Sequence, residues 1–218
     1  MTAAGAARIG TSRLRNAAIA AGTILFLRAA LPAEEVAVSL DPGRTTITFS
    51  LGATLHTVHG SFKLKTGALH FDTATGEARG EIVVDALSGE SGNASRDKRM
   101  RDEILETRRF PTAVFRPDRF EGRLSADGDS EGNLRGRLEI HGAEHALLIP
   151  VRIHASSGHA TAAARFEIPY VQWGLKNPST LLLHVNDRVE IQIQATVDVS
   201  PGKAAAAISS AAGDARTP

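Results

Sequence analysis

The stretch "RVEIQIQATVDV", Arg188 to Val199, decides the fold class of this chain. Its apolar side chains occupy every second position, beginning with Val189 and Ile191, and polar residues stand between them. Successive side chains of a β-strand point to opposite faces of the sheet, so a period of two predicts a strand with one buried and one wet face. This stretch therefore predicts a half-buried β-strand near the end of the folded region.

The same period of two recurs along most of the chain. Shorter runs with this alternation are "TTITFSL", "SFKLK", "ALHF", "RLEI", "LLIPVRI" and "RFEI". Turn-rich segments at 72–77, 125–133 and 156–159 separate several of them, and such short connections predict a mostly antiparallel sheet. A sheet with one apolar face must close into a barrel or stack as a sandwich, and the periodicity alone leaves both architectures open.

Composition excludes several classes of function. The 25 Lys and Arg residues balance 24 Asp and Glu residues, so no strong global field would attract nucleic acid or an anionic membrane. The chain has no cysteine, which excludes disulfides, thiolate metal sites, a cysteine nucleophile and a lipid-modified cysteine. No nucleic-acid partner is expected.

The two ends differ in composition from the body. Arginines precede an apolar run at 17–27, and the small-residue stretch "AALPAEE" follows it, which is the order of a secretory signal. We therefore expect residues 1–33 to be an export signal or leader, with an uncleaved anchor and a disordered leader as alternatives. Residues 36–200 would form the domain in a periplasmic or secreted protein. Residues 201–218 have small side chains without apolar periodicity and predict a disordered tail.

One segment breaks the strand pattern: "SRDKRMRDEILETRRFPTAVF", Ser95 to Phe115. Apolar residues recur there at offsets of three and four, from Met100 to Leu105, which predicts a short amphipathic helix. Ser95 is the predicted N-cap, an aspartate follows in the first turn, and two arginines occupy the last. The residue before Pro111 is biased away from the α region, so the helix should end there.

These segments carry a resemblance to a known family. The stretch "HGSFKLKTGALHFD" (59–72), the helical segment and "RGRLEIHGAEHALLIPV" (135–151) are similar, in order and spacing, to the YceI family of bacterial lipid- or polyisoprenoid-binding proteins. The matching positions are Gly60, Phe62, Phe71, Asp72, Arg96, Asp97, Pro111, Phe115, Gly136, Leu138, Ile140 and Gly142. The resemblance implies an all-β fold: an extended antiparallel lipocalin-like β-barrel with one short crossing helix. It also implies a periplasmic location and an apolar tunnel for a long isoprenoid or other amphiphile.

If such a tunnel exists, inward apolar residues would form its walls. The candidates are Phe49, Leu51, Phe62, Leu64, Phe71, Phe115 and Phe166. The alternative is that these side chains fill the barrel and leave no room, as most apolar faces do. The residues alone favour a filled core, and the resemblance favours tunnel walls.

Other candidates concern the polar end of a lipid. Tyr170 and Trp173 share an irregular stretch and would form either a lid over a head group or a structural plug. Three cations are candidates for a phosphate or carboxylate head group: Arg96, Arg101 and Lys176. For Arg96, the alternative is a structural pair with Asp97 that anchors the helix start.

No catalytic motif, metal site or cofactor motif emerges. His141 and His145 flank a turn without an evident third ligand. The sequence therefore predicts a non-catalytic carrier of a polyisoprenoid or similar long-chain lipid, with transient membrane contact and homo-oligomerisation left open. Two alternatives remain: a filled-barrel interaction module that docks a membrane protein, and a hydrolase that acts on an apolar substrate.

Overall fold

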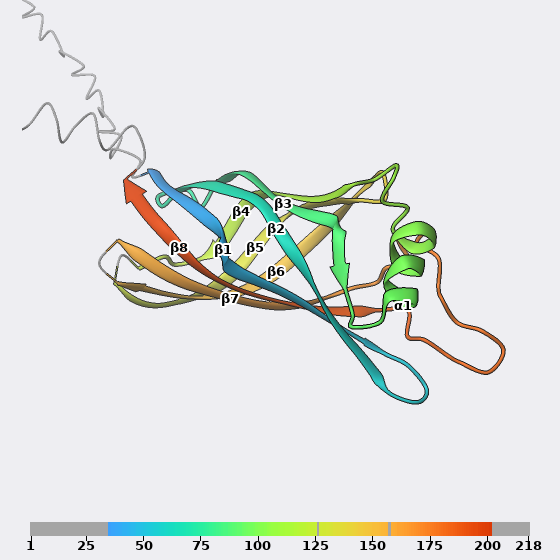
Figure 1. Cartoon of the computed structure of the whole chain (residues 1–218). Helices are drawn as coiled ribbons and strands as arrows, with labels where there is room; N and C mark the ends of the chain where they lie inside the picture. The colour runs from blue at the N-terminus through green and yellow to red at the C-terminus, as the bar shows by residue number, and fades with distance from the viewer. Residues whose placement is uncertain (1–34, 126, 157, 202–218) are drawn as a thin grey trace, which may run out of the picture. The chain divides into compact units, whose positions relative to one another are not determined.

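The computed structural model describes residues 35–125, 127–156 and 158–201. Within them, eight strands form one closed antiparallel barrel, in which each strand pairs with the next and β8 returns to β1 (Figure 1). The strands are β1 (Glu35–Gly52), β2 (Thr57–Asp72), β3 (Ala78–Glu90), β4 (Thr112–Gly122), β5 (Gly128–Ile140), β6 (Ala143–Ser156), β7 (His159–Ile168) and β8 (Val189–Pro201). The predicted lipocalin-like barrel is confirmed. The predicted leader and, after Pro201, the predicted tail lie outside the described residues.

Alternation places the apolar side chains inside the barrel. In β8, Ile191, Ala195 and Val197 are buried, whereas Gln194 and Asp198 on the opposite face are exposed. Burial of each large aliphatic side chain contributes about 1.5–3 kcal/mol, so this pattern supplies most of the driving force for closure. No large side chain of the described residues is fully buried, which indicates an interior that is not completely filled.

A bulge in β1 explains why its apolar positions change parity. Val38 and Leu40 pack on the core from even positions, whereas Ile47 and Phe49 do so from odd ones. The register with β8 shifts between Leu40 and Thr45, and an irregularity of this kind reverses which positions face inward. The bulge thus keeps both halves of a long strand in one core.

The helix lies where β3 and β4 separate. These strands pair only from Ile82–Phe115 to Asp85–Thr112, and the chain between them forms α1 (Ala94–Arg99) and a π-helical turn, η1 (Met100–Ile104). The apolar side of this segment, Met100, Ile104 and Leu105, packs against the core as predicted. Figure 1 shows the helix at one end of the barrel.

Both predicted ends of the helix were wrong. The N-cap is Asn93, not Ser95: its side chain accepts a hydrogen bond from the backbone N–H of Arg96 at 3.0 Å. Asparagine and serine are comparable caps, so the earlier residue could take the role. The helical turns end at Ile104, because Glu106 adopts a left-handed φ of 45° and its carbonyl accepts from the Arg109 and Phe110 N–H groups.

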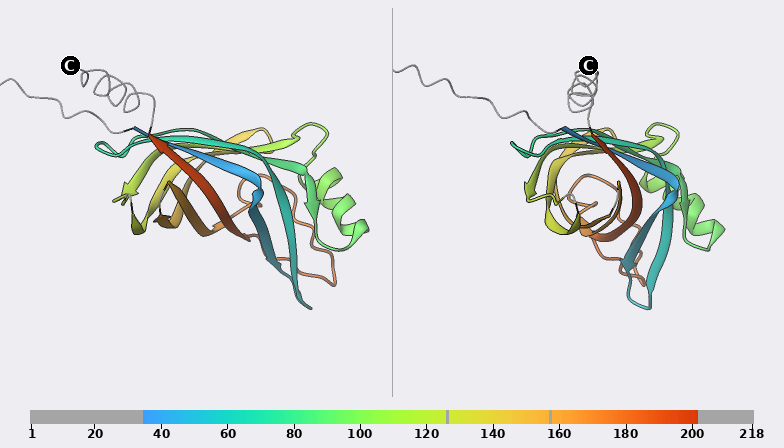
Figure 2. Two further views of the ribbon diagram at one scale, coloured as in Figure 1. Left: turned by 60° about the vertical axis from the view of Figure 1, so that its left-hand side comes forward. Right: turned by 90° about the vertical axis from the view of Figure 1, so that its left-hand side faces the viewer.

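The two ends of the barrel differ in their connections. The chain termini of the barrel and the β2–β3, β4–β5 and β6–β7 turns lie at one end, whereas the β1–β2 hairpin tip, the helix, the β5–β6 turn and the β7–β8 connection lie at the other (Figures 1 and 2). We call the latter the helix end. It carries every long connection and is therefore the end at which the fold can build a site.

Gly60 provides a test of the packing between β1, β2 and β3. A Cβ at this position would lie 2.3 Å from the carbonyl oxygen of Glu90 and 2.4 Å from the ring of Phe49. We expect Gly60→Ala to lower the free energy of unfolding by about 2–3 kcal/mol, because backbone and ring must both move. Urea unfolding measures the loss. The matched Gly43→Ala, whose nearest atom is the exposed Asp41 carboxylate at 3.3 Å, should be close to neutral, and equal losses would contradict this packing.

Candidate functional site

The helix end of the barrel encloses a cavity of about 820 Å³. This volume lies within the range of roughly 300–1,000 Å³ that is common for small-molecule sites. Its walls are mostly aliphatic and aromatic, and strands from around the barrel contribute to them: Ile47, Phe49, Leu51, Ile82, Val84, Phe115, Leu138, Ile149, Phe166, Ile191 and Ile193. Several of these side chains are only half-buried because they face the cavity.

The predicted wall residues divide into two groups. Five line the cavity: Phe49, Leu51, Phe62, Phe115 and Phe166. Leu64 and Phe71 are buried in the core but are not part of the lining. Sequence reasoning missed Ile47, Ile82 and Ile191, although each stands at the inward parity of a predicted strand, and that parity could have identified them.

Toward the termini, the inside of the barrel next to the cavity is packed. Phe71 meets Phe120 edge to face, with ring centroids 6.3 Å apart. Beyond these rings a second cluster of small side chains contains Ala155, Ala160 and Ala195. None of these five residues lines the cavity, so the cavity stops short of this end, where Ala195 lines a separate and more polar hollow.

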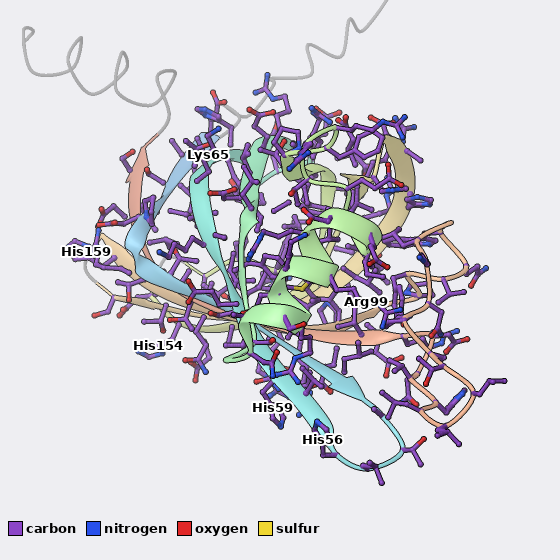
Figure 3. All side chains as sticks on the ribbon, turned by 45° about the vertical axis from the view of Figure 1, so that its right-hand side comes forward. His56, His59, Lys65, Arg99, His154 and His159 are labelled. Atoms are coloured by element: carbon purple, nitrogen blue, oxygen red, sulfur yellow. The ribbon has the colours of Figure 1, made fainter. Side chains whose placement is uncertain are left out.

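Charged side chains surround the opening of the cavity. Most come from the helix: Arg96, Lys98, Arg99, Asp102 and Glu103, joined by His56 and His141. Figure 3 shows Arg99 on the helix and His56 on the β1–β2 hairpin. Opposite charges pair here, since Lys98 lies 2.5 Å from Asp102 and Arg99 lies 3.4 Å from Glu103. The cavity thus combines an apolar chamber with a rim that carries both signs of charge.

Each of the three predicted head-group cations has a partner within the protein. Arg96 donates to the Ser91 hydroxyl and to the Ser91 carbonyl, both at 2.7 Å, and Arg101 donates to the Gly89 carbonyl at 3.3 Å. Lys176 lies 3.2 Å from Glu103, and this hydrogen bond is the main reason that the pKa of the Glu103 carboxyl is lowered. Of these three cations, only Arg96 lines the cavity.

The loop with the single tyrosine and tryptophan forms part of the cavity wall. Tyr170 is buried and lines the cavity, and its hydroxyl donates to the Asn186 carbonyl at 2.7 Å. Burial raises the pKa of this phenol to about 12, so it stays a neutral donor. Trp173 is not in the lining: its ring stacks on His145 with centroids 4.3 Å apart. Leu175 is also buried, so the loop is anchored in the core rather than laid over it.

One histidine–carboxylate pair touches the cavity. His141 Nε2 lies 3.2 Å from Glu106 Oε1, and the pKa of Glu106 is lowered, first by the Arg109 hydrogen bond and then by His141. At this separation the two atoms do not meet hydrogen-bond geometry, and His141 Nε2 has no hydrogen-bond partner among the described residues. Over the same part of the chain, no group of three or more His, Asp or Glu side chains could hold a metal ion. The pair joins the segment after the helix to the β5–β6 turn.

Fold and cavity together define a class: an antiparallel barrel of the lipocalin-like kind with an apolar chamber below a charged rim at its helix end. The chain belongs to the YceI-like family, since residues 39–197 match the YceI-like domain. Among curated proteins no match is found. Within residues 35–201, where the structure describes them, no helix has the length and apolar character to cross a membrane.

Solved structures share this fold. Burkholderia cenocepacia BcnA is 15% identical, with a TM-score of 0.58, over 74% of this chain and 99% of its own. A polyisoprenoid-binding domain from Saccharophagus degradans, implicated in plant cell wall breakdown, is 17% identical with a TM-score of 0.56, over 75% and 98% of the two chains. The Campylobacter jejuni YCEI protein is 16% identical with a TM-score of 0.55, over 66% and 85%. At these identities the likeness establishes the fold.

Proposed function

We propose that this protein binds a polyisoprenoid or similar long-chain amphiphilic lipid in the barrel cavity and carries it without changing it chemically. The observation that carries the proposal is the apolar chamber of about 820 Å³, which stops short of the Phe71–Phe120 contact and opens beneath charged side chains at the helix end. Membership of the YceI-like family supports it, as does the description of the Saccharophagus relative as a polyisoprenoid-binding domain.

The binding energy would come from removing the hydrocarbon chain from water. Each buried CH₂ contributes about 0.8 kcal/mol. Lining residues such as Phe49 and Ile191 therefore need only to exclude water from the hydrocarbon chain. The head group would stay at the rim. There, an anionic group would compete with Glu103 for Arg99 and Lys176, whereas Arg96 and Arg101 are engaged with backbone carbonyls.

The alternatives have less support. An interaction module with a filled barrel is disfavoured by the cavity itself. A hydrolase that acts on a substrate in this cavity would have to use the His141–Glu106 pair, and His141 Nε2 has no hydrogen-bond partner among the described residues. Export to the periplasm or secretion is part of the proposal and is supported by the leader-like composition of residues 1–33.

Native mass spectrometry of protein purified without detergent tests the proposal, followed by organic extraction and lipid identification. We expect a stoichiometric adduct that is released on denaturation. If the purified protein is empty, it is incubated with a polyprenyl phosphate and, separately, with a long-chain fatty acid. An unchanged protein mass after both incubations would refute the proposal.

A further inference from the structure

Three leucines at the helix end are almost completely exposed. Leu181 is 104% exposed, Leu182 is 95% and Leu55 is 81%, whereas the other large exposed hydrophobics of the described chain, Leu87 and Leu148, are near 50%. Such values mean that no neighbouring side chain shields the three leucines. Fully exposed apolar side chains that gather at one place mark an interaction surface rather than ordinary surface composition.

The three leucines belong to two loops that are joined to each other. Leu55 lies at the tip of the β1–β2 hairpin, and Leu181 and Leu182 lie in the β7–β8 connection. An isolated bridge pairs Ala53 with Val185, and the Thr54 N–H donates to the His184 carbonyl at 2.9 Å. Figures 1 and 2 show the hairpin and this connection projecting together. We call the three side chains the leucine tips.

The bend that presents Leu181 and Leu182 is held by its own hydrogen bonds. The Thr180 N–H donates to the Leu183 carbonyl at 2.8 Å, and the Leu183 N–H donates to the Thr180 hydroxyl at 3.2 Å. Polar residues and glycine usually occupy the apex of such a bend. Two leucines at this apex do not stabilise the bend, which indicates that they serve an interaction with another molecule.

The same loops provide part of the cavity wall. Ala53, Leu183 and Val185 line the cavity, so the leucine tips stand beside its opening. The chain contains no aspartate or glutamate from 52 to 60 or from 175 to 186. The polar residues around the tips are threonines, asparagines, Ser179, Lys176 and histidines, and Figure 3 shows His56 and His59 on the hairpin. An anionic or zwitterionic surface therefore meets no carboxylate in these loops.

We propose that the leucine tips insert into the surface of a lipid bilayer and place the cavity opening against it. A fluid bilayer can surround each leucine side chain on all sides, whereas a rigid protein surface cannot. Side chains that are exposed on all sides therefore fit a bilayer better than a protein partner. Insertion as such needs no cargo. The purpose of insertion would be to transfer a lipid between the bilayer and the cavity, and this part of the inference rests on the proposed function.

A single labelled cysteine tests the insertion, because the chain has no cysteine of its own. Leu182→Cys and the control Leu148→Cys, on the barrel wall, are each labelled with the polarity-sensitive dye nitrobenzoxadiazole in the full chain. Vesicles of phosphatidylcholine, with and without phosphatidylglycerol, are then added. We expect a blue shift and protection from an aqueous quencher at 182 only. A shift at neither position, or equally at both, would overturn the proposal.

A second variant distinguishes vesicle binding by the leucine tips from vesicle binding by the apolar run at 17–27, which every variant retains. Adding Leu55→Ser and Leu181→Ser to the labelled Leu182→Cys chain should lower vesicle partition, read from the dye, by roughly tenfold or more. Unchanged partition would contradict the inference. If the double substitution instead dissolves a dimer seen by analytical ultracentrifugation, with no vesicle effect, the tips are a protein interface and the inference fails.

The two proposals can fail separately. Native mass spectrometry of Leu55→Ser/Leu181→Ser/Leu182→Ser should still show the cavity lipid, because none of these side chains lines the cavity. Loss of insertion with the cargo retained supports the leucine tips. Insertion by a protein that never holds a lipid would refute only the carrier function.

Discussion

Phe62→Asp abolishes retention of the cavity lipid, whereas Lys63→Glu on the neighbouring position leaves it unchanged; this is the largest effect that we expect. Phe62 lines the cavity, and its ring centroid is 5.4 Å from that of Phe49. Lys63 points to solvent from the other face of β2. A carboxylate among apolar walls costs several kcal/mol, whether it stays charged or takes up a proton. The adduct in native mass spectra, measured for both variants, gives the comparison.

A cavity-filling variant distinguishes loss of lipid binding from loss of the fold. Ala113 on β4 lines the cavity, and Ala113→Phe would occupy the space of the ligand without introducing charge. We expect reduced retention in this variant at an unchanged or higher Tm, since added apolar contacts in an empty space do not strain the barrel. Full retention in Ala113→Phe, or equal loss in Lys63→Glu, would show that the faces of β2 and β4 are assigned wrongly.

Asp97→Ala should cause the second large effect, a loss of about 3 kcal/mol in the free energy of unfolding. Asp97 is 7% exposed at the start of the helix. Its carboxylate accepts from the Ser91 N–H at 2.8 Å and from the Ser91 hydroxyl, which in turn accepts from Arg96. Removing it leaves the part-buried N–H and hydroxyl of Ser91 without their shared acceptor, and the Ser91 hydroxyl is the group that accepts from Arg96.

Chemical denaturation measures this loss, with Asp102→Ala as the matched control on the same helix. Asp102 is exposed and pairs with Lys98 four residues before it, an arrangement that adds little to stability. The Asp97 variant should also retain less lipid, because the helix forms one side of the cavity opening. Similar losses for the two variants would mean that the Ser91–Asp97–Arg96 network does not hold the helix in place.

The fold could be predicted from the sequence because each strand carries its own signal. A period of two in "RVEIQIQATVDV" states which side chains face inward, and the register of β8 with its neighbours confirms it. Segment boundaries were less secure. The predicted turn at 125–133 is strand from Gly128 on, because these polar and glycine residues pair with β6 from Ala155 to Pro150.

The candidate site could be predicted only in part. Alternation shows which side chains point into the barrel, but not how far they lie from the side chains of the opposite wall. Phe62 and Phe71 are both apolar residues between polar neighbours in β2, yet Phe62 borders the cavity and Phe71 packs against Phe120. Which inward side chains meet and which remain apart depends on barrel diameter and strand stagger, which are properties of all eight strands together. The leucine tips had no periodic signal, since they stand outside the strands.

Closure of the barrel by β1 and β8 also determines the order in which the protein can fold. The contacts that join Ser50 to Glu190 and Val38 to Val199 bring together the two ends of the sheet. Local hairpins such as β5–β6 can form early, but this final pairing carries the largest loop-closure entropy. A nascent chain therefore holds two unpaired edges until its last strand has been synthesised, and the apolar chamber is the last part of the barrel to form.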